Sequence, residues 1–247
     1  MTEPIIETRG LTKRFGRFTA VDHITLSVMP GEIFGFLGAN GAGKTTAMRM
    51  LCGLSRPTEG WGCVAGCDIT RQPEAVKRHI GYMSQRFSLY DDLTVAENIR
   101  LFGGIYGLSR AELARRTDEL TGSLGMEAER RKRVAALPLG LKQRLAFSVA
   151  MLHRPPLVFL DEPTGGVDPV TRRAFWEMID EAAAAGTTVF VTTHYMDEAE
   201  YCHRVSVMVD GQIRALDTPE RLKQQFGATT MEDVFIGLAQ TAKRSQP

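Results

Sequence analysis

The stretch IFGFLGANGAGKTTAMRMLCG, residues 33–53, decides the fold of this 247-residue chain. Its opening run IFGFL (33–37) is short and apolar, as expected of a buried strand. After a glycine-rich loop, TTAMRMLCG (45–53) carries apolar residues at helical spacing and ends on Gly53, a common helix stop. A strand, a glycine loop and a helix in this order predict one unit of an α/β fold.

The glycine loop contains the complete pattern G-x-x-x-x-G-K-[ST]. Glycines let the backbone wrap closely, so that consecutive N–H groups point at phosphate oxygens, and the following helix adds its positive end. Lys44 is placed to reach the β- and γ-phosphates, and the Thr45 hydroxyl is placed to bind Mg²⁺. The pattern predicts a triphosphate site made of Gly38, Ala39, Asn40, Gly41, Ala42, Gly43, Lys44, Thr45 and Thr46.

A pair of carboxylates follows a second apolar run. LVFLD (157–161) is typical of a central parallel strand and ends on Asp161, with Glu162 next. Asp161 stands where a phosphate site of this kind needs a carboxylate for its metal. Glu162 lies at the mouth of the same strand and is a candidate base for an attacking water. Acidic pairs at strand ends are common, so this one is informative because it accompanies the phosphate loop.

Further elements extend the α/β pattern. TVFVTT (188–193) predicts another parallel strand, and Asp168-Pro169 predicts the start of a helix that ends near Gly186. RVSVMV and QIRAL, joined by Asp210-Gly211, predict a hairpin with a type I′ turn. Residues 5–8 and 24–28 predict antiparallel strands.

The middle of the chain has helical signals instead. Thr94 and Ser109 each precede a glutamate by three residues, the spacing of a capping box. Apolar residues follow at helical intervals. We expect one domain, with an α/β core and β subdomain in residues 1–85 and 155–220. A helical subdomain is inserted at 86–154, and a C-terminal helical extension covers 221–247.

Composition excludes other classes. The chain has 30 Lys and Arg against 29 Asp and Glu, and this net charge of +1 offers no attraction for nucleic acid. No stretch approaches the roughly 18–20 apolar residues that span a bilayer, and the N-terminus lacks a secretory signal. The four cysteines are too sparse for a disulfide scaffold, and Cys63 and Cys67 have no matching pair for zinc. A cytoplasmic protein is expected.

With these motifs the chain resembles the nucleotide-binding subunits of ABC transporters, over residues 15 to 194. The resemblance implies a P-loop NTPase (RecA-like) core with an antiparallel β subdomain and an inserted α-helical subdomain, and hydrolysis of ATP with Mg²⁺. Phe15 matches the aromatic residue that stacks on adenine. Gln85, in GYMSQ, matches the glutamine that links Mg²⁺ and the attacking water to the membrane partner. His194 matches the histidine that contacts the γ-phosphate.

The resemblance thus implies a set of roles. Glu162, His194 and Gln85 are the expected catalytic residues, and Thr45, Gln85 and Asp161 the expected metal ligands. The expected partners are transmembrane permease subunits and a second nucleotide-binding domain. The permease subunits are expected to bind near residues 85–93, and the second domain is expected to enclose the nucleotide between itself and this chain. Residues 164–168 match the loop that crosses this dimer interface. The chain would then lie on the cytoplasmic face of the cell membrane.

One motif departs from the family. Its signature is usually Leu-Ser-Gly-Gly-Gln, whereas this chain has Leu137-Pro138-Leu139-Gly140-Leu141. In the family, the serine hydroxyl and the glycine amides of the signature bind the γ-phosphate of ATP held by the other subunit. Pro138 has neither a hydroxyl nor an N–H, so this site is weakened. We therefore expect pairing with a different domain that has a normal signature.

The likeness is strongest to the C-terminal half of tandem nucleotide-binding subunits of drug-efflux exporters, where LPLG is familiar. It predicts a sister domain upstream and an introduced start at Met1. The alternative is a soluble ABC-type ATPase acting on ribosomes or DNA. Such proteins usually carry two such domains in one chain, or a long coiled coil in the insertion, and neither is seen in these 247 residues. A GTPase is disfavoured because the chain has no Asn-Lys-x-Asp motif, and a kinase because Asp161 and Glu162 with His194 suit attack by water better than transfer to a substrate hydroxyl.

Overall fold

The computed structural model describes residues 3–85 and 89–244. Its centre is a six-stranded sheet in which β9, β3, β8, β7 and β6 are parallel and β10 is an antiparallel edge. In spatial order the strands are β10 (Gln212–Asp217), β9 (Arg204–Val209), β3 (Ile33–Gly38), β8 (Thr188–Thr193), β7 (Leu157–Asp161) and β6 (Ile80–Met83). The predicted α/β class is confirmed.

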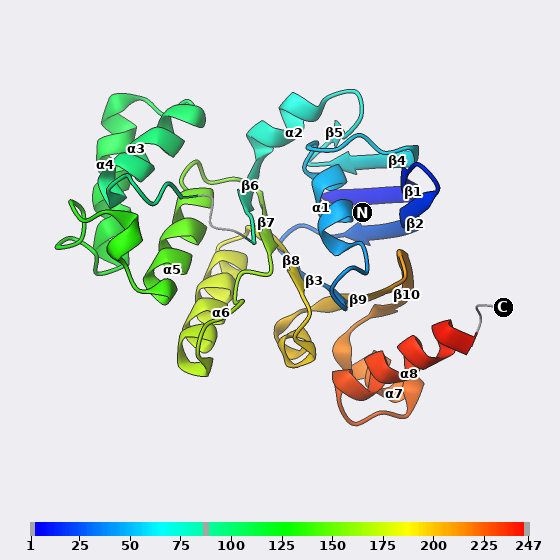
Figure 1. The fold of residues 1–247 in the computed structure, drawn as a ribbon. Helices are drawn as coiled ribbons and strands as arrows, with labels where there is room; N and C mark the ends of the chain where they lie inside the picture. Colours follow the sequence, from blue (N-terminus) through cyan, green and yellow to red (C-terminus); the bar gives the residue numbers. More distant parts are fainter. Residues whose placement is uncertain (1–2, 86–88, 245–247) are drawn as a thin grey trace.

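A second, antiparallel sheet lies beside the first (Figure 1). Its order is β2 (Phe18–Val28), β1 (Ile6–Phe15), β4 (Glu59–Val64) and β5 (Cys67–Asp68). The strand predicted at 24–28 is part of β2, and the strand predicted at 5–8 overlaps the start of the longer β1. The pairing of β1 with β2 shifts register three times after Thr8, and these irregularities hide the apolar alternation that marks a strand.

Helices cover both faces of the central sheet. On one face, α1 (Lys44–Leu51) contacts β3 and β7 and also β2 and β4 of the antiparallel sheet. On the other face, α6 (Pro169–Ala184) contacts β3, β8 and α5. Asp168 caps α6 as predicted, and its carboxylate accepts hydrogen bonds from two backbone N–H groups of the first turn. The remaining helices of this part are α2 (Pro73–His79), η2 (Met196–Tyr201), α7 (Pro219–Phe226) and α8 (Met231–Arg244).

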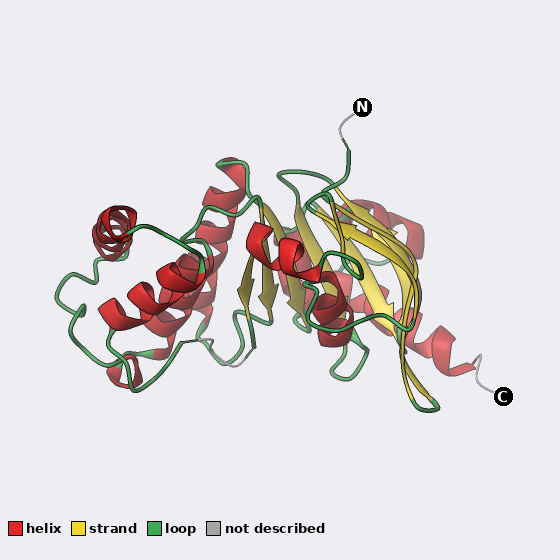
Figure 2. Cartoon of the chain, turned by 90° about the horizontal axis from the view of Figure 1, so that it is seen from above, coloured by secondary structure: helices red, strands yellow, loops and turns green. Residues whose placement is uncertain are grey.

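The helical subdomain stands apart from the antiparallel sheet, across the central strands (Figures 1 and 2). It consists of α3 (Val95–Ile105), α4 (Arg110–Ser123), η1 (Val134–Ala136) and α5 (Leu139–Ala150). Both predicted capping boxes are present, at Thr94 with Glu97 and at Ser109 with Glu112. The predicted start of the subdomain at residue 86 lies outside the described residues. Within the described part of the chain, no helix combines the length and hydropathy needed to cross a membrane.

Aromatic rings fill the layer between the central sheet and α1. The ring of Phe190 lies 5.5 Å from that of Phe34, 5.3 Å from Phe36 and 5.3 Å from Phe159, measured between centroids. These four side chains come from three adjacent parallel strands and are fully buried. Their contact secures β3 and β7, which carry the phosphate loop and the carboxylate pair at their ends.

Replacing Phe190 with alanine removes the ring that the other three share. We expect the free energy of unfolding to fall by about 3–5 kcal/mol, the usual cost of a large cavity in a core. Urea denaturation followed by circular dichroism measures this loss. Phe226→Ala, at a ring that is 38% exposed, is the control and should cost well under half as much. Equal losses would contradict the central position of Phe190.

Candidate nucleotide site

The glycine loop follows β3 and leads into α1, and two of its glycines are required by close backbone contacts. A Cβ at Gly43, whose φ is +104°, would lie 2.2 Å from the carbonyl oxygen of Ala20. A Cβ at Gly38 would lie 2.5 Å from the carbonyl oxygen of Met208. The N–H of Gly211, in the turn between β9 and β10, donates to the carbonyl of Ala42 at 3.0 Å. Neighbouring backbone thus fixes the loop from two sides.

A pocket of about 310 Å³ opens over this loop. Eight of its lining residues were predicted from the sequence, namely Asn40, Gly41, Gly43, Lys44, Thr45, Thr46, Gln85 and Glu162. Phe18 and Ala20 from β2 complete the lining. Predicted residues from positions 40 to 162 therefore meet in one place.

Lys44 lies at the bottom of the pocket and is 4% exposed. Its ammonium donates to the carbonyl oxygens of Gly38 at 2.8 Å and Ala39 at 3.1 Å, and lies 3.3 Å from Oε1 of Glu162. Burial lowers the pKa of Lys44, and the facing Glu162 carboxylate opposes this by favouring the charged form. A phosphate entering the pocket must therefore compete with the carboxylate for the same ammonium group.

The carboxylate of Glu162 contacts the two other predicted catalytic residues. The Gln85 amide donates to its Oε2 at 2.9 Å, and Nδ1 of His194 lies 3.1 Å from the same oxygen. The backbone of Glu162 has φ +48°, a left-handed conformation that costs free energy for a residue other than glycine. Its N–H donates to the carbonyl and the hydroxyl of Thr192, both at 3.1 Å, which holds the strained residue in place.

The expected metal ligands Thr45 and Asp161 adjoin each other. The Thr45 hydroxyl lies 3.3 Å from Oδ1 of Asp161, and the Thr192 hydroxyl donates to that same oxygen at 2.7 Å. Burial raises the pKa of Asp161, while the two hydroxyl hydrogen bonds lower it. A hydroxyl, a carboxylate and the nearby Gln85 amide oxygen form the all-oxygen set that Mg²⁺ prefers, so the residues fit this ion.

Two residues at the site were not predicted. The Thr192 hydroxyl contacts the carboxylate of Asp161 and the backbone N–H of Glu162, but in the sequence Thr192 is one of several threonines in an apolar strand. Phe18 lines the pocket, whereas the predicted adenine-stacking Phe15 is absent from the lining among the described residues. Phe15 pairs with Phe18 across the β1–β2 hairpin, is 56% exposed and has the Lys13 ammonium 5.2 Å from its ring centroid. Both rings are thus open to solvent near the loop.

The signature residues lie elsewhere. Pro138 is the N-cap of α5 and provides no side-chain cap, in agreement with the missing serine hydroxyl. A Cβ at Gly140 would lie 2.5 Å from Cγ2 of Thr171, so this glycine lets α5 pack closely on the start of α6. A separate pocket of about 420 Å³ lies here, lined by both helix starts and the 166–168 loop. The pocket over the phosphate loop and the pocket at the signature residues are therefore separate, and they share no lining residue.

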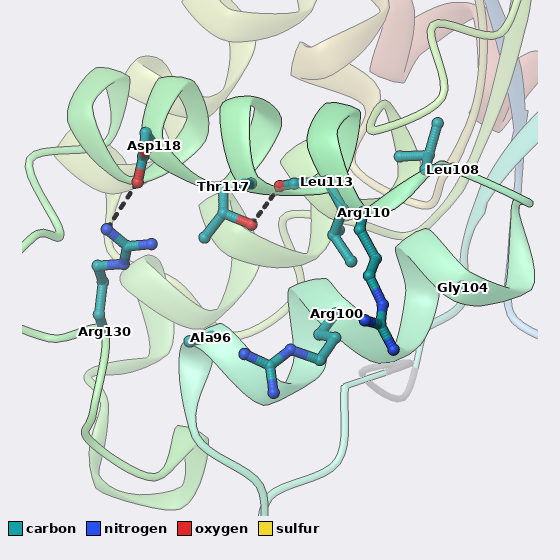
Figure 3. Close-up of a pocket in the computed structure, with 10 residues that line it drawn as sticks. Ala96, Arg100, Gly104, Leu108, Arg110, Leu113, Thr117, Asp118 and Arg130 are labelled. Carbon is teal, nitrogen blue, oxygen red and sulfur yellow. Dashed lines mark hydrogen bonds and ion pairs between the residues drawn. The ribbon is translucent and has the colours of Figure 1, made fainter.

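A larger pocket, of about 710 Å³, lies between α3 and α4 (Figure 3). Arg110 extends from α4 toward α3, where Arg100 also projects, and Arg130 forms an ion pair with Asp118 at 2.7 Å. Small and apolar residues complete the lining, among them Ala96, Gly104, Leu108 and Leu113. This arginine-lined groove, as we name it, is separate from the phosphate pocket and is positively charged.

Thr192→Val keeps the shape of the strand but removes the hydroxyl that contacts Asp161 and Glu162. We expect it to cost about 1–3 kcal/mol of stability, since buried polar groups lose a partner. We also expect Mg²⁺-dependent ATP binding to weaken about tenfold or more, because the carboxylate loses its orienting hydrogen bond. Chemical denaturation and calorimetric titration measure the two effects.

The matched control is Thr188→Val on the same strand. Thr188 is equally buried, and its hydroxyl accepts a hydrogen bond from the Gly31 N–H at 2.9 Å, far from the carboxylates. This variant should lose comparable stability and keep its Mg²⁺–ATP affinity. Equal binding by both variants would contradict a role for Thr192 at the site.

Relatives in sequence are ATP-binding proteins of transporters. The chain is 46% identical over 241 residues to the probable multidrug ABC transporter ATP-binding protein YbhF of Escherichia coli. The match covers 96% of this chain but only 42% of YbhF, so the chain spans less than half the length of that relative. It is 38% identical over 227 residues to the daunorubicin/doxorubicin resistance ATP-binding protein DrrA of Streptomyces peucetius, covering 92% of this chain and 69% of DrrA.

Solved structures have the same fold. An ATP-binding subunit of an ABC transporter superposes with a TM-score of 0.85 at 30% identity, covering 95% of this chain and 99% of the other. The dimeric ATP-binding cassette MJ0796, in a post-hydrolysis state with ADP and phosphate, gives 0.78 at 25% identity, covering 86% and 98%. The model of the ABC transporter family matches residues 21–165. The chain belongs to the ABC transporter family.

Proposed function

We propose that this chain binds ATP between the phosphate loop and a second nucleotide-binding domain, and that hydrolysis there drives export by partner membrane subunits. The observation that supports this most is the position of Glu162. Its carboxylate lies beside Lys44 at the end of the pocket and also contacts Gln85 and His194. A base next to the residue that holds the terminal phosphate is suited to water attack.

Each residue then has a distinct task. The loop amides and Lys44 bind the phosphates, and Phe15 stacks on adenine, with Phe18 beside it at the pocket wall. Glu162 takes the proton from the attacking water, and His194 steadies both that carboxylate and the terminal phosphate. Thr45, Asp161 and Gln85 would hold Mg²⁺. When bound, this ion offsets phosphate charge in the transition state.

We infer that this chain pairs with a different domain. Pro138 leaves the start of α5 without a side-chain hydrogen bond for phosphate, and Leu139 is 39% exposed where the usual glycine-rich signature lets a nucleotide approach. Losing one or two charge-assisted hydrogen bonds would cost about 1.5–3 kcal/mol each. A partner with a normal signature would restore them at this chain's own phosphate loop.

Export through membrane partners is favoured by the relatives, whose names refer to multidrug transport and drug resistance. None of these names supports the alternative of a soluble ATPase that acts on ribosomes or DNA. We propose that the membrane subunits dock near residues 85–93, of which 86–88 lie outside the described part. The lining of the arginine-lined groove begins at Ala96, three residues after this stretch. This docking would hold the chain on the cytoplasmic face of the membrane.

Glu162→Gln should bind ATP but hydrolyse it at least about 100-fold more slowly, because the amide cannot accept the proton. ATP affinity should not fall, since Lys44 is released from its carboxylate partner. Phosphate release and equilibrium nucleotide binding measure these two quantities. Glu177→Gln, which removes a carboxylate from an exposed pair with Arg173 on α6, is the control and should hydrolyse ATP normally. Unchanged turnover in Glu162→Gln would rule out the assigned role.

Asymmetric pairing is tested by mixing. The chain is combined with a nucleotide-binding domain that has a normal signature but a glutamine in place of its own catalytic glutamate, so that activity arises only at this chain's phosphate loop. We expect ATP turnover per chain to rise at least about tenfold over the chain alone. A partner with its signature serine also replaced should give little increase. Equal activity with and without the partner would contradict the proposal.

A further inference from the structure

Glu198 is a buried carboxylate to which no role has been assigned above. It lies on η2, which follows His194, and its exposed fraction is 0%. Its Oε1 accepts a hydrogen bond from the hydroxyl of Thr164 at 2.5 Å, and Thr164 is also buried. Thr164 stands two residues after Glu162. This hydrogen bond therefore connects the segment that carries the proposed base with the segment that carries the proposed histidine.

Arg172 of α6 extends the connection. Its Nε lies 3.6 Å from the same Oε1 of Glu198. Its guanidinium carbon lies 4.3 Å from the centroid of the Tyr195 ring, and that ring lies 4.2 Å from the His194 ring. Thr164, Glu198, Arg172 and Tyr195 thus form a continuous path of contacts behind the active carboxylate, which we name the Glu198 path.

Stability alone is a poor explanation for this arrangement. Within the described residues, Oε2 of Glu198 and Nε of Arg172 are buried without a hydrogen-bond partner. Such atoms are rare in folded proteins because each costs free energy, and apolar side chains of similar size would fill the space at lower cost. A buried charge that is only partly satisfied points to a positional role at the neighbouring site.

We propose that Glu198 is a positioning residue for ATP hydrolysis, which sets the distance between Glu162 and His194 through Thr164. This inference rests on the proposed function of those two residues. The contact it controls is the 3.1 Å separation between Oε2 of Glu162 and Nδ1 of His194. Both residues lie in short segments beyond their strands, so the 164–198 hydrogen bond fixes one segment against the other.

Thr164→Val tests the path without changing any charge. It removes the hydroxyl, so the two segments lose their hydrogen bond. We expect kcat to fall at least about tenfold, since displacements below 1 Å at reacting groups have effects of this order. The KM for ATP should stay within about twofold, because the phosphate loop is untouched. Thr164→Ser, which keeps a hydroxyl, should recover most of the activity.

A matched pair of charge variants accompanies it. Glu198→Gln still accepts from Thr164 but no longer pairs with Arg172, and we expect a smaller fall in kcat than in Thr164→Val. Asp197→Asn removes the neighbouring carboxylate, which is 70% exposed and lies 3.5 Å from the same arginine. That variant should match the wild type. Melting temperatures of all four variants are measured alongside.

Nuclear magnetic resonance of the His194 ring, identified by its loss in His194→Asn, reports position without turnover. Its signals should shift in Thr164→Val and stay near their wild-type positions in Thr164→Ser. Unchanged kcat and unchanged His194 signals in Thr164→Val would overturn the proposal. The proposal would also be overturned if Thr164→Val lost melting temperature and ATP affinity in parallel with kcat. A wild-type chain that binds ATP but shows no turnover with any partner would instead refute the proposed function, and the ring signals would still test the path.

Discussion

Parallel hydrogen bonding among β3, β8 and β7 is the constraint on which the site depends. Leu37 pairs with Thr193, and Asp161 pairs with Thr192, so the three strands end at one level. The residues that follow these ends, in the phosphate loop, at Glu162 and at His194, are therefore delivered to one edge of the sheet. Short flexible connections could not place them so closely, because each would lose entropy on ordering.

Charge balance shapes this edge further. Lys44 and Glu162 are both nearly buried, and each reduces the cost of desolvating the other at a separation of 3.3 Å. Gln85 and His194 then occupy the second carboxylate oxygen. With ATP present, the terminal phosphate would replace the carboxylate beside the ammonium. The resting arrangement thus holds the side chains of Glu162 and Lys44 in place before a ligand arrives.

Features encoded within a few residues were predictable, and features that depend on register were not. The glycine loop, the Asp168 cap, the two capping boxes and the Asp210-Gly211 turn, with φ of +48° and +79°, carry their signals locally. β4 was missed because Gly60, Trp61 and Gly62 interrupt apolar alternation and its partner strand is irregular. Thr192 was missed because only the pairing of β8 with β7 shows that it faces Asp161.

The turn between β9 and β10 supports the phosphate loop from a distant part of the chain. Gly211 donates to Ala42 and also accepts from Asp22 at 2.8 Å, so one glycine fastens the loop to the antiparallel sheet. During synthesis the ribosome releases the loop long before this turn. In the nascent chain the phosphate loop would therefore lack this backbone support until β9 and β10 have left the exit tunnel.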